Sequence, residues 1–127
     1  MDYDKSIDKV LKAIEELKIE NKNLPIVIEG EKDKKALKKL DITGKKIIIN
    51  NGISLTDFCD RLSKKYDEII ILTDWDRKGG FLKRRIQENL KGRVKCNNRY
   101  RKIFAKNTMT KTVEGLPSYI ETITSKG

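Results

Sequence analysis

The sequence predicts an α/β fold: a Rossmann-like parallel β-sheet of about four strands with helices on both faces. Three short aliphatic runs, at 25–28, 47–49 and 69–72, are continuously apolar, which is typical of strands buried on both faces. Between them, apolar residues recur every three or four positions, the period of an amphipathic helix. Strands that alternate with helices in this way favour a parallel sheet covered by helices.

The length of 127 residues predicts a single domain. An N-terminal amphipathic helix is expected at about residues 4–20, because its apolar residues form one stripe. The core of the domain is expected at about residues 24–96. A basic C-terminal extension at about 97–127 completes the chain.

The first half of the core alternates as the fold requires. A Lys-rich helix at 31–40 follows the first strand and leads to the second, at 47–49. Ser54 is expected to cap the next helix, because Asp57 stands at the capping-box spacing. The third strand, at 68–73, is the most apolar of the set.

The second half of the chain shows a less regular alternation of strands and helices. After a loop at 74–80 we expect a helix that ends at Gly92, followed by a short strand around residues 94–96. Residues 97–112 show no clear pattern, and Pro117 suits the first turn of a closing helix. The helix before Gly92 carries the apolar residues Phe81, Leu82, Ile86 and Leu90.

The composition excludes several kinds of chemistry. The chain has no histidine and only two cysteines, so zinc sites and nucleophiles that use a histidine base lack their parts. Any metal must therefore be held by carboxylates. The cysteines, Cys59 and Cys96, form no disulfide framework, and no apolar run nears the roughly 18 residues of a membrane helix. We expect a cytoplasmic protein that does not contact a membrane.

The positive charge is concentrated in one stretch. The chain has 29 basic and 19 acidic residues, a net charge of +10. Residues 77–106 hold twelve of the basic residues and one acid, so this stretch carries +11 and the remainder −1. A cluster of this kind predicts a polyanionic partner such as nucleic acid.

Acidic residues follow two of the predicted strands. Glu29 ends the first strand, and Asp74 and Asp76 follow the third. Ligands of parallel α/β sheets bind beyond the carboxyl ends of the strands, so these side chains are expected at one edge. The two aspartates offer the hard oxygen ligands that suit Mg²⁺, and Glu29 can join them or act as an acid or base.

Each acidic residue also has a structural interpretation. Glu29 before a glycine can be a turn residue, and Asp33 can stabilise a helix N-terminus. Asp74 and Asp76 can initiate a turn and cap the following helix. Their joint placement favours the functional interpretation, because clustered like charges repel unless a cation or a basic partner lies there.

Two segments contain the acidic residues: 27–37, VIEGEKDKKAL, and 69–80, IIILTDWDRKGG. Together they resemble the signature motifs of the Toprim family, which includes bacterial primases, type IA and type II topoisomerases and the ribonuclease that matures 5S ribosomal RNA. The chain is also similar to the small stand-alone Toprim proteins of archaea. A shorter segment at 112–116, TVEGL, resembles the one that closes the Toprim region of the maturase-like branch.

The resemblance implies the Toprim fold and assigns roles to matching residues. Glu29 would be the general acid or base of phosphoryl transfer and would also bind metal, and Asp74 and Asp76 would bind Mg²⁺. The residues that would shape the site are Gly30, Asp33, Gly79 and Gly80. Topoisomerase and primase activities need a nucleophilic tyrosine from another domain or a zinc module, which this chain lacks.

The basic stretch provides the expected nucleic-acid contacts. Its segment 97–104 mixes arginine with aromatic residues, which suits phosphate contact together with base stacking. Tyr100 and Phe104 are one helical turn apart, so a pair that faces the core is an equal alternative. The candidate contact residues are Arg77, Lys78, Arg84, Arg85, Arg99, Tyr100, Arg101 and Lys102.

Three functions remain open. The first is a Mg²⁺-dependent Toprim enzyme that cleaves or processes phosphodiester bonds, with RNA slightly favoured over DNA because of the maturase-like segment. The second is a non-catalytic nucleic-acid-binding module that works with a partner enzyme. The third, which we favour least, is an enzyme that acts on nucleotides or small phosphoesters. A protein partner or a homo-oligomer is compatible with each.

Overall fold

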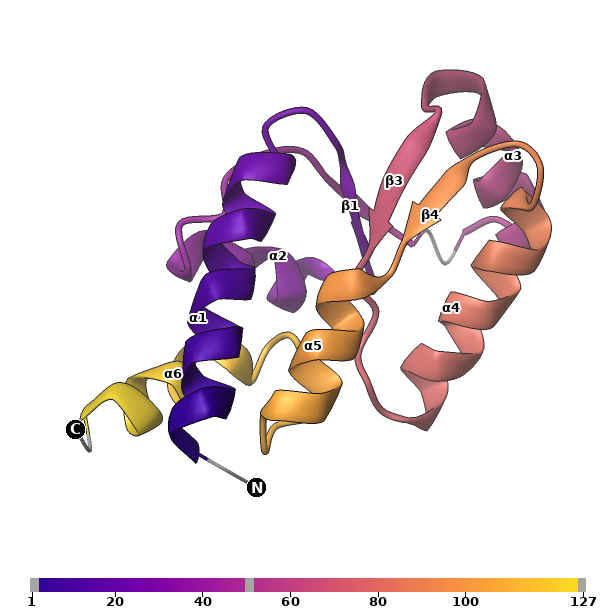
Figure 1. The fold of residues 1–127 in the computed structure, drawn as a ribbon. Coiled ribbons are helices and arrows are strands. Elements are labelled where there is room, and N and C mark those ends of the chain that lie inside the picture. Colours follow the sequence, from indigo (N-terminus) through magenta and orange to yellow (C-terminus); the bar gives the residue numbers. More distant parts are fainter. Residues whose placement is uncertain (1–2, 50–51, 126–127) are drawn as a thin grey trace.

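The computed structural model describes residues 3–49 and 52–125 and confirms the α/β prediction. Four helices and four strands alternate along the chain, and two further helices follow the last strand (Figure 1). The elements are α1 (Tyr3–Glu20), β1 (Ile26–Ile28), α2 (Glu31–Lys39), β2 (Lys46–Ile48), α3 (Leu55–Lys65), β3 (Glu68–Ile71), α4 (Arg77–Leu90), β4 (Lys95–Asn97), α5 (Arg99–Asn107) and α6 (Leu116–Ser125).

The four strands form one sheet in the order β2-β1-β3-β4. Every neighbouring pair is parallel. Val27 at the centre of β1 is paired with Ile47 of β2 on one side and with Ile71 of β3 on the other. The two central strands are therefore β1 and β3, the strands that precede the two acidic motifs.

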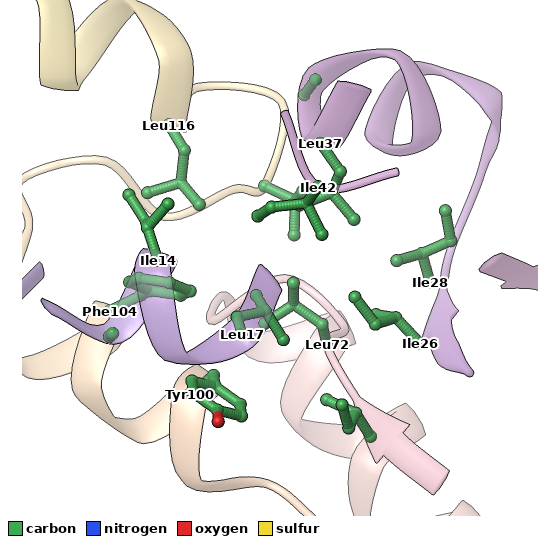
Figure 2. Close-up of a cluster of buried hydrophobic side chains, with 14 of the residues drawn as sticks. Ile14, Leu17, Ile26, Ile28, Leu37, Ile42, Leu72, Tyr100, Phe104 and Leu116 are labelled. Atoms are coloured by element: carbon green, nitrogen blue, oxygen red, sulfur yellow. The ribbon is translucent and has the colours of Figure 1, made fainter. Parts of the chain in front are cut away.

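Side chains alternate across the sheet and build a hydrophobic core on each face. Ile26 and Ile28 of β1 pack with α1, α2, α5 and α6. Val27, between them, packs with Phe58 of α3 and Ile86 of α4 in the second cluster. Figure 1 shows these two groups of helices on opposite sides of the strands, and Figure 2 shows the first cluster. Helices cover both faces, as predicted.

Helix α5 was not predicted, although its residues belong to the core. Tyr100 and Phe104 are both 0% exposed and pack in the cluster that contains α1. Phe104 also contacts the Trp75 ring, with the centroids 5.7 Å apart. The alternative of a core-facing pair is therefore correct, and the Tyr100 ring is not available to stack on a base.

Helix α4 begins earlier than the sequence predicted. Asp76 is its N-cap, and Asp76 Oδ1 accepts a hydrogen bond of 2.7 Å from the Gly79 amide. Both glycines of the expected loop therefore lie in the first turn of the helix. Gly92 follows α4 with φ 79°, a left-handed conformation that favours glycine, so the predicted end of the helix is confirmed.

One of the four apolar residues of α4 is exposed. Leu82, Ile86 and Leu90 pack in the second cluster. Phe81, in contrast, is 49% exposed. The second cluster also contains Cys59 and Cys96, both free thiols. Among the helices that the structure describes, none is long and apolar enough to cross a membrane.

Candidate functional site

The site lies where the strand order reverses. From β1 the chain first moves to β2 on one side, and later returns to β3 on the other. Such a switch point opens a crevice at the carboxyl ends of the two central strands. Glu29 directly follows β1, and Asp74 follows β3 after two further residues. The Asp74 amide donates a 2.7 Å hydrogen bond to Glu29 Oε2, so the two predicted motifs meet at this point.

Burial and neighbouring negative charge alter the Glu29 carboxyl group. Burial raises its pKa, and the bond from the Asp74 amide opposes this rise. The charges of Asp74 and Asp76 raise the Glu29 pKa further, while the Lys78 ammonium lowers it. Lys78 is therefore a cation close enough to act on the acidic group, although it lies exposed on α4.

Asp33 and Gly30 belong to the same cluster. The Gly30 amide donates a 3.1 Å hydrogen bond to Asp33 Oδ2, which closes the first turn of α2. The Asp33 side chain is 7% exposed, and burial together with the charges of Asp74 and Glu29 raises its pKa to about 6. This residue therefore caps α2, as its structural interpretation proposed, and also adds a buried acid beside the site.

Asp74 and Asp76 each bind a backbone amide. Asp74 Oδ1 accepts a 2.8 Å bond from the Val113 amide, while Asp76 caps α4. Burial raises the Asp74 pKa, the Val113 bond lowers it, and the charges of Asp76 and Glu114 raise it again. Each carboxylate uses one oxygen in this way and has a second oxygen for another ligand.

Gly79 has a steric reason to be glycine, and Gly80 does not. A Cβ atom on Gly79 would lie 1.7 Å from the Asp74 carbonyl oxygen. The Gly79 carbonyl also accepts a 2.8 Å bond from the buried Thr73 hydroxyl. A Cβ on Gly80 would meet only the ends of Arg101 and Arg84, at 3.6 and 3.9 Å. Of the two glycines, Gly79 shapes the acidic loop.

Arg101 supports the acidic loop from inside the protein. Its Nε donates to the Thr73 carbonyl at 3.1 Å, and its Nη2 donates to the Asp74 carbonyl at 2.8 Å. The residue is 9% exposed. Burial lowers the pKa of this guanidinium, and the negative charge of Asp76, Glu29 and Asp74 opposes that change. The structure thus gives Arg101 an internal role in place of the expected nucleic-acid contact.

A segment between α5 and α6 completes the site, and sequence reasoning gave it little weight. Besides the Val113 bond, the Trp75 amide donates to the Lys111 carbonyl at 3.0 Å. The Trp75 indole donates to the Thr110 carbonyl at 2.6 Å. Only the short resemblance at 112–116 pointed to this segment. Glu114, within it, is close enough to raise the Asp74 pKa.

The remaining basic candidates differ in their surroundings. Arg99 is paired with Glu16 at 2.7 Å and Glu20 at 3.6 Å, and its guanidinium lies 4.6 Å from the Tyr100 ring centroid. Within residues 3–49 and 52–125, the salt bridges involve none of the exposed cations of α4. These cations are Arg77, Lys78, Arg84 and Arg85, and Lys102 of α5 is also exposed.

The carboxylates of Glu29, Asp74 and Asp76 suit a Mg²⁺ ion that retains several of its waters. In the described part of the chain, no three Asp, Glu, Cys or His side chains are grouped so that they could hold a metal ion. Mg²⁺ commonly binds through one or two carboxylates and retains several waters, so it does not need such a group. Glu29, Asp74 and Asp76 each have a second oxygen, and their mutual repulsion would be relieved by a cation. The arrangement therefore suits a water-rich site.

Comparisons with known proteins identify the family of this chain. The Toprim domain family matches residues 25–107. A UPF0292 protein of Thermoplasma volcanium is 44% identical over 102 residues, which cover 80% of this chain and 86% of the relative. A UPF0292 protein of Methanocaldococcus jannaschii is 37% identical over 123 residues, or 94% of this chain and 96% of the relative.

A solved structure gives the same result at the level of the fold. A protein from Aquifex aeolicus superposes with a TM-score of 0.65 and is 29% identical, covering 76% of this chain and 88% of that protein. The family match begins just before β1 and ends with α5, so it includes both acidic motifs and the helix that carries Arg101. Because the match extends over more than half of the sequence, the chain belongs to the Toprim family.

Proposed function

We propose that this chain is a Mg²⁺-dependent enzyme that cleaves or processes phosphodiester bonds in nucleic acid, with RNA as the favoured substrate. Toprim domains generally bind Mg²⁺ and act on nucleic acid. The observation that carries the proposal is the 2.7 Å bond between the Asp74 amide and Glu29, which joins the two acidic motifs at the switch point of the sheet. The bond from Val113 to Asp74 supports the preference for RNA, because it involves the maturase-like segment.

The proposed roles follow from the surroundings of each carboxyl group. Glu29 has a raised pKa, so it holds a proton closer to neutral pH than an exposed glutamate and can exchange it with a phosphate-ester oxygen. Asp74 and Asp76 would hold Mg²⁺, which stabilises negative charge on the phosphate oxygens when it is bound. The α4 cations would hold the neighbouring phosphates.

Cleavage assays test the catalytic proposal. Labelled single-stranded and structured RNA and DNA are incubated with Mg²⁺ or with EDTA. Asp74→Asn and Glu29→Gln should each abolish Mg²⁺-dependent cleavage, and Asp57→Asn, an exposed acid in the first turn of α3, should not. Cleavage that persists in both site variants would refute the proposal.

Metal binding has a readout that does not depend on activity. Trp75 is the only tryptophan and lies between the two aspartates in the sequence. Its indole is bonded to Thr110, so its fluorescence reports on the acidic loop. Titration with Mg²⁺ should change the emission of the wild type, and Asp74→Asn should weaken or remove this response. A wild-type emission that Mg²⁺ leaves unchanged would count against the site.

The contacts of the carboxylates favour a second candidate, a non-catalytic module that binds nucleic acid beside a partner enzyme. Glu29, Asp74 and Asp76 each accept a hydrogen bond from a backbone amide, so they organise the loop even without metal. This candidate predicts binding that falls steeply with salt and no turnover of any substrate. Capture of the nucleic acid bound in cells by Asp74→Asn, followed by sequencing, would identify substrates to assay for both candidates.

A further inference from the structure

Phe81 is an exposed aromatic residue in an unusual position. Its side chain is 49% exposed on α4, whereas the neighbouring Leu82 packs against the core. On the surface of a helix, the neighbours of a residue lie three and four positions before and after it. For Phe81 all four of these residues are basic and exposed: Arg77, Lys78, Arg84 and Arg85.

The ring is already in contact with one of these cations. The Arg85 guanidinium lies 5.7 Å from the centroid of the Phe81 ring, a cation–π geometry. The salt bridges of the described residues include none of the four cations, whereas Arg93 and Arg99 from the same basic stretch are paired with acids. The α4 face therefore presents an aromatic ring surrounded by cations that form none of the salt bridges of the described residues.

This face adjoins the acidic site. Phe81 is five residues beyond the N-cap Asp76, or about 7.5 Å along the helix axis at 1.5 Å per residue. The Arg84 side chain extends back toward the start of the helix, because its Nη1 would be 3.9 Å from a Cβ on Gly80. In Figure 1, the chain leaves the carboxyl end of β3 and enters α4 beyond that end of the sheet. The distance of about 7.5 Å between Asp76 and Phe81 along the helix axis equals about two nucleotide steps of a stacked strand.

We propose that Phe81 is a stacking platform for an unpaired base, and that the chain therefore recognises single-stranded segments of nucleic acid. A base in a duplex is stacked between its neighbours and is not available to an aromatic side chain, whereas an unpaired base is. The cations around the ring bind the backbone phosphates on either side of that base. This inference rests on the proposed action on nucleic acid and adds the class of substrate.

The test measures binding without turnover. Fluorescence anisotropy in EDTA gives the affinity for a labelled single strand of about ten nucleotides. A second strand has the same number of phosphates but abasic sugars in place of nucleotides, so it retains the charge and lacks the bases. Phe81→Ala should weaken binding to the first strand about tenfold and leave binding to the abasic strand unchanged. Phe81→Trp should bind the first strand at least as tightly as the wild type.

Two controls separate stacking from other effects. Phe81→Leu retains an apolar side chain but not an aromatic face, so it should resemble Phe81→Ala. Ile19→Ala removes a comparable exposed apolar side chain, 63% exposed on α1, and should not change either affinity. Circular dichroism spectra and melting temperatures verify that the variants are folded.

The outcomes also separate this inference from the proposed function. Equal loss of affinity for both strands, or no loss for either, would overturn the stacking platform. A shift in oligomeric state in Phe81→Ala, seen by light scattering, would overturn it in favour of an interface between two copies. Stacking without cleavage in the Mg²⁺ assay would retain this inference and refute the catalytic proposal. Cleavage by a Phe81→Ala variant that binds the single strand with wild-type affinity would support the catalytic proposal and overturn the stacking platform.

Discussion

Gly79 shows how a single residue can fix the shape of the acidic loop. A Cβ at this position would overlap the Asp74 carbonyl oxygen, at 1.7 Å, and backbone atoms cannot move aside as a flexible side chain can. We expect Gly79→Ala to lower the free energy of unfolding by about 2–3 kcal/mol. Gly80→Ala is the matched control, because its Cβ has ordinary contacts and alanine favours a helix by about 1 kcal/mol. Urea unfolding that ranks the two variants equally would contradict this explanation.

The buried carboxyl groups predict an unusual dependence of stability on pH. The Asp33 pKa is about 6 in the folded protein, above the ordinary value of 3.8, so the folded state binds its proton more tightly than the unfolded state does. The free energy of unfolding should therefore fall as the pH rises from about 4 to above 6. Glu29 and Asp74, whose pKa values are also raised, act in the same direction.

Asp33→Asn tests this dependence, because asparagine retains an oxygen acceptor for the Gly30 amide and has no charge. Urea unfolding in EDTA at several pH values should give a shallower slope than the wild type and a more stable protein above pH 6. Asp57 has the same position in α3, the third residue after the N-cap, but is exposed. If Asp57→Asn reduced the slope as much as Asp33→Asn, burial would not be the cause.

At the scale of elements, α5 supports the loop between β3 and α4. Arg101 spans the Thr73 and Asp74 carbonyls with two donors, a geometry that lysine cannot reproduce. We expect Arg101→Lys to lower the free energy of unfolding by about 1–3 kcal/mol and to weaken the response of Trp75 fluorescence to Mg²⁺. Lys102→Gln, at the exposed neighbouring position, should change neither. An unchanged stability and an unchanged Mg²⁺ response in Arg101→Lys, which retains the positive charge, would show that Arg101 contributes only charge.

The elements differ in how well the sequence predicted them. The aliphatic runs of β1 and β3 predicted these strands because strands buried on both faces have few polar positions. The run of isoleucines also predicted β2, although it is an edge strand whose residues are only partly buried. Helix α5 was missed because its buried face includes Arg101 and Asn107, polar residues that obscure the apolar period. The start of α4 was missed because the Gly79-Gly80 pair indicates a loop, whereas the Asp76 cap places both glycines in a helix.

Part of the site could also be predicted, because its acidic residues follow predicted strands. Glu29, Asp74 and Asp76 each follow a strand, so the topology alone brings them to one edge of the sheet. The supports of the site come from Arg101 and from the segment that contains Thr110 and Val113, and they depend on tertiary contacts that no local pattern reveals.

For the whole molecule, the structure divides the arginines of the basic stretch into those with internal partners and those exposed on α4. Of the arginines at 93, 99 and 101, the first two are paired with acids and the third binds backbone carbonyls. The α4 cations around Phe81 are exposed beside the acidic edge, so opposite charges lie close together on the same end of the sheet. A phosphate backbone that crosses this end would meet the cations first, and a metal ion would compensate its repulsion from the carboxylates.

This distribution predicts the salt dependence of binding. A single strand that contacts the four α4 cations should give a slope of log K against log salt of about −3, at about −0.7 for each phosphate. Replacing both Arg84 and Arg85 by glutamine should reduce the magnitude of the slope by about 1.4. Arg93→Gln is the matched control, because Arg93 belongs to the same basic stretch but is paired with Asp60 at 2.8 Å. Anisotropy titrations from 50 to about 300 mM salt measure these slopes. If Arg93→Gln reduced the slope as much as the double variant, the accessible surface would extend beyond the α4 face, since the effect would then follow total charge.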